Sequence, residues 1–354
     1  MVKRIFCGAC GRAAIACALL SGTSVARAQL PELEVQWEGF DIRLSGGAAA
    51  QVAVFDDDDL TTDSPDAQID LFARLNAQWT SPDGIIIGAN IEQNSRRRAS
   101  EVLEAGEIYG FVASDYGRLE VGLQDGPADT LAFAAPLIAL GQVRGEFSRY
   151  AGTQALLRAV DTQDAFKVLY LSPPVGGLRG GVSWSPRVRR NAAAVDSRER
   201  IELDNAFEFG LQYQQPVGDW ILGASAGYAT GEADPLTTRA DLSSWSVGAE
   251  ARRGPLRIGA AYVDRGDSNR LDRGFDQWEI NYGIAWVMPD WGIAGSAAYT
   301  EASDRQNRLI GFGGFYRLHP NIQLRADVVQ FREERFRISV DDGVAAILEL
   351  QLTI

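Results

Sequence analysis

Short segments in which apolar side chains occupy every second position constrain the fold of this 354-residue chain more than any other feature. Across residues 42–55 the even positions are apolar or small, whereas Arg43 and Gln51 lie among the odd positions. Residues 69–80, 206–214 and 277–287 repeat this alternation. Because successive side chains of a β-strand point to opposite faces, a period of two predicts strands with one apolar and one polar face.

The connectors between these segments are of two kinds. One kind is a tight turn rich in Pro, Gly, Asp or Asn, found at residues 81–84, 115–117, 174–177, 216–219, 253–255, 288–290 and 319–321. The other is a longer polar stretch, found at residues 56–68, 95–106, 124–163, 189–205, 231–241, 266–276, 303–307 and 333–342. Seven turns and eight loops predict sixteen strands. Short turns at one end and long loops at the other are typical of a transmembrane β-barrel.

The charged side chains indicate which face of the sheet points inward. The polar faces of the strands carry bases such as Arg74 and Arg325 and acids such as Asp70 and Glu92, which a water-filled lumen can solvate. Tryptophans near the strand ends match the aromatic rows of membrane interfaces. The sequence therefore predicts an all-β fold, a 16-stranded antiparallel transmembrane β-barrel with an inward-folded third loop. A secreted β-sandwich with core tryptophans is the alternative.

Residues 1–28 have the composition of a secretory signal peptide. Basic residues precede a short apolar run at residues 13–20, and Ala26 and Ala28 give a small-x-small cleavage pattern. All three cysteines lie in this segment, so the mature chain has no disulfide and no Cys-ligated metal. We expect residues 29–38 to form a short periplasmic segment and residues 39–354 to form the barrel.

The charge balance of the mature chain narrows the class of partner. Residues 1–28 carry four basic side chains and no acid, which leaves 30 basic and 47 acidic side chains. This excess of acids argues against nucleic acid, which selects basic surfaces, and favours attraction of cations. No apolar run after the signal reaches the roughly 18–20 residues of a membrane helix.

Residues 124–163 interrupt the alternation for longer than any other connector. Loops this long without regular structure are uncommon in compact domains and are usually functional. In a closed barrel such a segment either covers the mouth as a lid or folds into the lumen. We expect residues 124–163 to fold inward and narrow a water-filled pore, and we call them the constriction loop.

The signal segment, the sixteen strands and the long third loop together resemble the Gram-negative general porins, and most of all their alphaproteobacterial, Rhodobacter-type branch. The likeness covers the mature chain and is carried locally by VGLQDGPAD at residues 121–129 and GEFSRY at residues 145–150. It implies a homotrimer of barrels in the outer membrane, in contact with its lipid and lipopolysaccharide. Each barrel would be a passive channel for small hydrophilic solutes and ions. The family usually ends in Phe, and this chain departs from that pattern with Ile354.

The resemblance also implies a pore constriction in which acids on the loop face bases on the wall. In this sequence the loop acids are Asp125, Asp129, Glu146 and Asp161. Strand alternation points three candidate wall bases inward, namely Arg43, Arg74 and Arg325. The loop also holds arginines, so some of its acids have partners available within the loop. The acidic balance of the chain favours a weak preference for cations.

The sharpest acidic run lies in the first long loop and comprises Asp56, Asp57, Asp58 and Asp59. Clustered carboxylates are the ligands that Ca²⁺ prefers, so this run is a candidate Ca²⁺ site. The spacing of an EF-hand is missing, and a solvated acidic loop is the alternative. We expect no other cofactor.

The sequence offers little to support catalysis. Its only histidine, His319, lies in a tight turn beside Pro320, and none of the familiar nucleophile, zinc or phosphate-binding motifs is present. We therefore expect a channel and no enzyme. A substrate-specific outer-membrane channel and a non-conducting structural or adhesive barrel are the competing interpretations.

Overall fold

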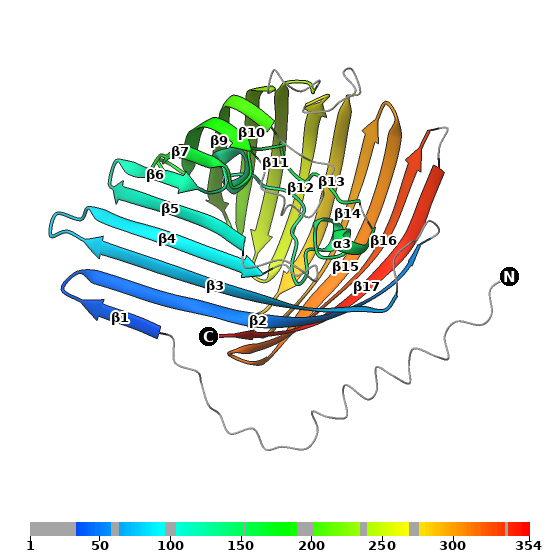
Figure 1. The fold of residues 1–354 in the computed structure, drawn as a ribbon, viewed down its shortest axis with the longest axis horizontal. Coiled ribbons are helices and arrows are strands. Elements are labelled where there is room, and N and C mark those ends of the chain that lie inside the picture. Colours follow the sequence, from blue (N-terminus) through cyan, green and yellow to red (C-terminus); the bar gives the residue numbers. More distant parts are fainter. Residues whose placement is uncertain are drawn as a thin grey trace, which may run out of the picture. The chain divides into compact units, whose positions relative to one another are not determined.

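The computed structural model describes residues 33–57, 64–95, 104–151, 153–189, 202–233, 239–268, 276–336 and 339–354. These residues form a barrel in which β2 to β17 follow one another in one antiparallel sheet, and β17 pairs with β2 to close it (Figure 1). The predicted 16-stranded antiparallel barrel is confirmed. Within the described part of the chain, no helix has the length and apolar character needed to cross a membrane.

The first half of the barrel contains β1 (Leu33–Trp37), β2 (Phe40–Asp57), β3 (Asp66–Thr80), β4 (Ile86–Ser95), β5 (Glu104–Ser114), β6 (Gly117–Leu123), β7 (Phe166–Leu171), β8 (Leu178–Arg189) and β9 (Glu202–Val217). The second half contains β10 (Trp220–Ala233), β11 (Leu242–Arg253), β12 (Leu256–Gly266), β13 (Gln277–Val287), β14 (Trp291–Ala302), β15 (Arg305–His319), β16 (Ile322–Arg335) and β17 (Ser339–Thr353). Between β6 and β7 lie three short helices, α2 (Pro127–Thr130), η1 (Gln142–Arg144) and α3 (Ser148–Ala151).

The two ends of the barrel sheet meet along β2. Strand β17 pairs with residues 47–57 of β2, and the Ile354 amide donates to the Gly46 carbonyl at 2.8 Å. Strand β1 pairs with residues 40–44 of β2. The short segment expected before the barrel therefore contains a strand that joins the sheet. The sequence does not reveal this because the five residues of β1 are too few to establish a period of two.

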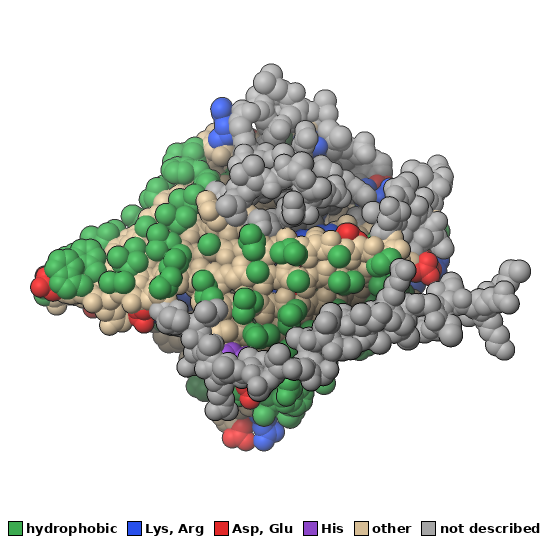
Figure 2. All heavy atoms as spheres, turned by 60° about the horizontal axis from the view of Figure 1, so that its bottom comes forward, with side chains coloured by type: hydrophobic (Ala, Val, Ile, Leu, Met, Phe, Trp, Pro, Cys, Tyr) green, Lys and Arg blue, Asp and Glu red, His purple; other side chains and the backbone are tan. Residues whose placement is uncertain are grey.

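The barrel is apolar on its outer face and polar within. Large apolar side chains project outward, including Phe312, which is 65% exposed, and Ile293, which is 58% exposed. In Figure 2 apolar side chains are spread over the outer face of the sheet, while the acidic side chains in view lie towards its ends. Lys167, Glu208 and Glu279, by contrast, are fully buried inside. A sheet surrounded by lipid requires this arrangement.

Two of the connectors expected to be long are short. Strand β14 ends at Ala302 and β15 begins at Arg305, so most of residues 303–307 belongs to a tight hairpin. Strand β16 continues to Arg335 and β17 begins at Ser339. The charged side chains at these strand ends resemble loop composition, but the cross-strand pairing continues through them.

Candidate functional site

The outgoing half of the constriction loop follows the inner wall of the barrel (Figure 1). The Phe133 amide donates to Ser225 Oγ on β10 at 2.7 Å, and the Ala135 amide donates to Asn281 Oδ1 on β13 at 3.0 Å. Farther along, the Gln142 amide donates to Asp327 Oδ2 on β16 at 2.6 Å. The loop backbone therefore uses wall side chains as acceptors for amides that would otherwise be buried without partners.

Glycines of the inner wall make room for this close approach. A Cβ on Gly248 would lie 1.8 Å from the Phe133 carbonyl oxygen, and a Cβ on Gly210 would lie 2.1 Å from the Pro127 carbonyl oxygen. No side chain larger than a hydrogen fits at these two positions unless the loop moves away. The predicted inward folding of the third loop corresponds in the structure to direct contact between loop backbone and wall backbone.

The tip of the constriction loop rests on the first strands of the barrel. Phe147 and Tyr150 pack with Phe55, and the rings of Phe55 and Tyr150 are stacked with centroids 5.2 Å apart. Tyr150 Oη donates to Gln51 Oε1 at 3.0 Å, and burial raises the pKa of Tyr150 to about 12. The tyrosine hydroxyl is thus a neutral donor throughout the physiological pH range.

The returning half is held by two buried carboxylates of the wall. Glu279 on β13 accepts from the amides of Leu156 and Leu157 at 2.6 and 2.9 Å. Glu208 on β9 accepts from the Thr162 amide at 2.9 Å and lies 3.6 Å from Lys167 Nζ. Because each carboxylate receives backbone donors in a buried setting, these bonds are stronger than neutral ones.

The wall formed by β3–β6 has a different character. Several of its lumen-facing side chains pair with one another, with Arg74 bonded to Glu92 and Arg118 bonded to Glu120. Arg74 remains 55% exposed. This region is therefore a hydrated, charged surface, whereas the wall behind the loop is packed.

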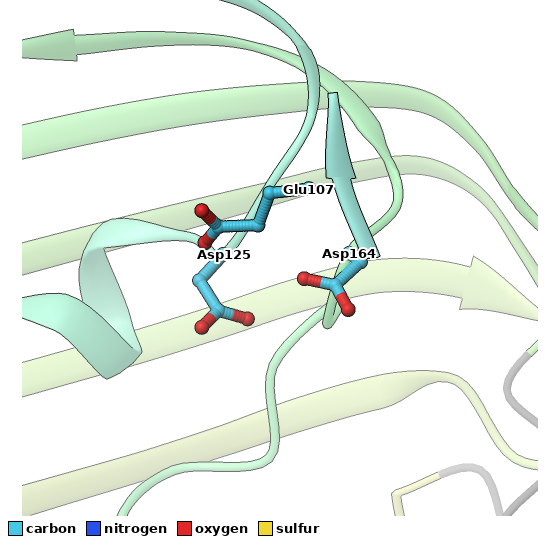
Figure 3. A group of neighbouring side chains, drawn as sticks. All are labelled: Glu107, Asp125 and Asp164. Carbon is cyan, nitrogen blue, oxygen red and sulfur yellow. The ribbon is translucent and has the colours of Figure 1, made fainter. Parts of the chain in front are cut away.

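A cluster of acids lies where the constriction loop leaves β6 and returns to β7. Oxygen atoms of Glu107, Asp125 and Asp164 lie within 4.8 Å of one another, and so do those of Asp125, Asp129 and Asp161. Figure 3 shows the carboxylates of Glu107, Asp125 and Asp164 turned towards one another. Hard oxygen ligands at such spacing suit small cations.

Burial, followed by the negative charge of Asp161, raises the pKa of Asp125 to about 7 and that of Asp129 to about 8. Arg158 opposes the shift on Asp129, because its Nη1 atom lies 2.5 Å from Asp129 Oδ1. The cluster therefore gains negative charge as the pH rises through the neutral range.

The structure brings together three of the four predicted loop acids, namely Asp125, Asp129 and Asp161. Glu146 lies apart from them at the tip of the loop. Its carboxylate is 2.6 Å from Arg149 Nε, and Arg149 Nη1 is in turn 3.2 Å from Asp70 on β3. Part of the acid charge is thus paired within the loop.

The three candidate wall bases pair with acids of the sheet, and Arg325 Nη1 also donates to the Ala139 carbonyl of the constriction loop at 3.4 Å. Their opposition to the loop acids across the pore stays a prediction. Arg43 lies near the turn end of β2 and pairs with Glu34 and Asp41, at 3.1 and 2.8 Å. Arg74 and Arg325 pair with acids of neighbouring strands, Glu92 and Glu349. Strand alternation gives the face on which a side chain lies, but not its height along the pore or its partner.

Two acids of the cluster, Glu107 and Asp164, were not among the predicted site residues. Glu107 alternates with the outward-facing Ile108 on β5, so the period of two places it on the inner face. Asp164 is exposed and lies just before β7. The signal for Glu107 was present in the sequence, but its proximity to the loop depends on the fold.

The candidate Ca²⁺ run of the first long loop lies largely outside the described residues. Asp58 and Asp59 are outside them, and Asp57 is described for its backbone alone. Asp56 is exposed at the end of β2. Binding of Ca²⁺ by Asp56–Asp59 stays a prediction.

A family model of the Gram-negative porins matches residues 13–335 of the chain. The chain belongs to the Gram-negative porin family. This porin is accordingly a channel protein of the outer membrane of a Gram-negative bacterium. No curated protein sequence matches it.

Solved structures show the same fold at low sequence identity. A loop-deletion mutant of OmpT, an outer membrane protein of Vibrio cholerae, is 14% identical with a TM-score of 0.63, covering 89% of this porin and 100% of that chain. The anion-selective porin from Comamonas acidovorans is 13% identical with a TM-score of 0.62, covering 89% and 100%. A mutant of the Rh. blastica porin is 14% identical with a TM-score of 0.60, covering 88% and 100%.

Proposed function

We propose that this porin is a passive, water-filled diffusion channel for small hydrophilic solutes and ions, with a weak preference for cations set at the constriction loop. The observation that carries the proposal is the acid cluster of Asp125, Asp129, Asp161, Asp164 and Glu107. Negative side chains beside a narrow aqueous passage raise the local concentration of cations and lower that of anions.

The basic side chains nearest the cluster, Arg144, Arg158 and Lys167, offset part of the negative charge of its five acids. Arg74 and Arg325 already have acidic partners on neighbouring strands, and Arg158 pairs with Asp129. The excess of acids therefore stays at the base of the loop. The fold itself leaves the sign of selectivity open, because a porin of similar structure is described as anion-selective.

We also propose that the functional unit is a homotrimer, as the resemblance implies. The outward face of β2 carries Gly46, Ala48 and Ala50, whereas outward positions of other strands carry large apolar side chains. Small residues allow two membrane surfaces to pack closely. Native mass spectrometry of the detergent-solubilised porin should give the mass of three chains, and a monomer would contradict this part of the proposal.

The alphaproteobacterial, Rhodobacter-type affiliation belongs with these proposals. Residues 121–129 and 145–150 support it, and both lie in or beside the constriction loop. Contact with lipopolysaccharide follows from the outer-membrane location of the porin.

The reversal potential of single channels in a KCl gradient tests the ion preference. The double variant Asp125→Asn, Asp161→Asn should move the reversal potential towards zero. Glu146→Gln is the matched control, because Glu146 is a loop acid paired with Arg149 away from the cluster. An unchanged potential in the double variant would show that the cluster does not set selectivity. Conductance that saturates with one solute would favour a substrate-specific channel, and absence of conductance would favour a structural barrel.

A further inference from the structure

Arginines line the inner wall between the constriction loop and the tight turns. Arg179 on β8 and Arg257 on β12 each lie two positions closer to a tight turn than a glycine of the same strand, Gly181 and Gly259. A Cβ on either glycine would collide with atoms of the constriction loop, so both glycines face the lumen. Because side chains two positions apart on a strand share a face, Arg179 and Arg257 face the lumen as well.

Arg317 on β15 is a third arginine of this kind. It lies four positions closer to a tight turn than Gly313, where a Cβ would collide with the Gln142 side chain of the constriction loop. A strand rises about 3.3 Å per residue, so the three arginines lie roughly 7–13 Å from these loop contacts. We call the inner wall between the loop contacts and the tight turns the turn-end section. Arg257 and Arg317 are exposed there, and Arg179 is half-buried.

Four other arginines of the turn-end section have their positive charge balanced by the sheet. Each forms an ion pair with an acid of its own or of a neighbouring strand, and the pairs are Arg43 with Asp41, Arg118 with Glu120, Arg252 with Glu250, and Arg325 with Glu349. Pairing with an acid of the sheet is therefore the common arrangement for an arginine at this height of the lumen.

Arg179, Arg257 and Arg317 depart from this arrangement. Among the described residues no acid forms an ion pair with any of them, and Arg179 Nε is buried without a hydrogen-bond partner. Asp290, in the turn beside β15, accepts from the Arg317 amide at 2.7 Å through its backbone carbonyl and not through its carboxylate. The seven arginines named here thus leave three positive charges without an acidic partner, on a chain that is acidic as a whole.

The pore therefore has two sections of opposite fixed charge in series. Acids gather where the constriction loop leaves the wall and returns to it, whereas unpaired arginines lie beyond the loop contacts towards the tight turns. Fixed charges of one sign on the walls of a water-filled passage raise the local concentration of the opposite ion. A guanidinium group also offers several N–H donors in one plane, which suits carboxylate and phosphate oxygens.

We propose that Arg179, Arg257 and Arg317 make the turn-end section a binding site for small oxyanions, such as phosphate and the carboxylate or phosphate groups of solutes in transit. The three arginines lie on the separate strands β8, β12 and β15, and they provide exposed contacts along the wall and no closed pocket. Binding of this kind is weak enough to release the anion, as conduction requires. The inference goes beyond the proposed cation preference, which concerns the acids at the base of the loop.

The test uses inorganic phosphate as the probe, with purified mature porin in a planar bilayer and KCl at constant ionic strength. Bound phosphate should slow the passage of smaller ions, so single-channel conductance should fall and saturate as phosphate is added. We expect Arg257→Gln to raise the half-maximal phosphate concentration at least about threefold, as loss of a charge-assisted contact predicts. The triple variant Arg179→Gln, Arg257→Gln, Arg317→Gln should raise it at least about tenfold.

The side of addition tests where phosphate binds. Phosphate added on the turn side reaches the three arginines without passing the acid cluster. The parent should therefore respond more strongly from one side of the membrane than from the other, and the triple variant should lose this difference. A parent that responds equally from both sides would contradict a site in the turn-end section.

Arg118→Gln is the matched control, because it removes one positive charge from the same section at an arginine that pairs with Glu120. This variant should respond to phosphate like the parent. A shift as large as that of Arg257→Gln would show that phosphate responds to the total charge of the lumen, and an unchanged triple variant would overturn the proposal outright. If the triple variant does not fold, the comparison of Arg257→Gln with Arg118→Gln decides the question.

This test and the test of the cation preference can fail independently. The variant Asp125→Asn, Asp161→Asn should keep the response to phosphate added on the turn side. The triple arginine variant should keep a reversal potential of cation-preferring sign in a KCl gradient. Loss of the phosphate response in Asp125→Asn, Asp161→Asn would assign phosphate binding to the constriction loop and would contradict the proposal.

Discussion

The inner wall behind the constriction loop and the inner wall formed by β3–β6 are built from different residues. The first uses glycines such as Gly248 and buried carboxylates such as Glu279, which contact loop backbone directly. The second uses charged side chains that pair across strands in contact with water, such as Arg74 with Glu92. The packed region holds the loop in place, whereas the hydrated region provides a polar surface past which solutes can move.

Substitutions should therefore have different effects in the two regions. In the packed region the free energy depends on fit and on satisfying every buried amide, so single substitutions should be costly. In the hydrated region water screens each charge and replaces a lost partner, so substitutions should change the field in the pore more than stability. Four substitutions or conditions test the contrast, from the largest expected effect to the smallest.

Gly248→Ala should have the largest effect. The added Cβ would lie 1.8 Å from the Phe133 carbonyl oxygen, so the loop must move inward or the sheet must shift. We expect the free energy of unfolding to fall by about 1–3 kcal/mol, as for other overpacked sites, and single-channel conductance to change. Gly110→Ala is the control, because a Cβ there would be 3.7 Å from its nearest neighbour, the Gly88 carbonyl oxygen. Equal denaturation midpoints for the two variants would show that the loop is not held against the wall.

Glu279→Gln should have the next largest effect. An amide side chain keeps the size of the carboxylate but accepts from the Leu156 and Leu157 amides without the charge. We expect a loss of about 1–2 kcal/mol in the free energy of unfolding and larger fluctuations of the open-channel current. Glu250→Gln provides the comparison, because Glu250 is an inner-wall acid that bonds to Arg252 and not to the loop. If Glu279→Gln had the same free energy of unfolding and the same current fluctuations as Glu250→Gln, Glu279 would have no role in holding the loop.

Lowering the pH should weaken the cation preference while leaving the fold intact. Burial raises the pKa values of Asp125 and Asp129 to about 7 and about 8. Both groups are therefore ionised above these values and take up protons as the pH falls through them. We expect the reversal potential in a KCl gradient to decrease in magnitude between about pH 9 and about pH 6.

The variant Asp125→Asn, Asp129→Asn should remove most of this pH dependence, because it has no ionisable group at these two positions. The Glu146→Gln control should retain it. A pH dependence that survives in the double variant would assign the titration to other groups.

Arg74→Gln should have the smallest effect on stability. The ion pair between Arg74 and Glu92 has an arginine that is 55% exposed, and such pairs contribute less than about 1 kcal/mol. Removal of the positive charge makes the wall more negative by one charge and should slightly strengthen the cation preference. A large loss of stability would show that the wall of β3–β6 is not the hydrated region described above.

The sequence predicts the barrel well because its signal is local and repeated. Strand β13 has the bounds that its alternation predicts, and each of the seven predicted turns falls at a junction between consecutive strands. The prediction was less accurate where composition and pairing disagree, as at residues 303–307, where charged strand ends resemble a loop. It also missed β1, which becomes a strand because β2 offers it an edge.

The acids of the candidate site could be identified from the sequence, but their partners could not. Asp125, Asp129 and Asp161 were identified by their charge within one anomalous segment, and they do lie together. Arg43 pairs with Asp41 on its own strand and Arg325 with Glu349 on a paired strand, contacts that alternation does not indicate, and the opposition of these bases to the loop acids stays a prediction. Which charges meet depends on the register between strands, and a single strand carries no information about its register with the next.

By itself the sequence determined that the chain is a closed sheet with an apolar exterior, because a period of two and the placement of charges follow from backbone geometry and solvation alone. Only the tertiary structure decided which wall the loop covers and which acids gather at its base. These features depend on contacts between residues up to hundreds of positions apart, such as Gln142 with Asp327. Closure of the barrel brings such residues together, and no local pattern records their distance.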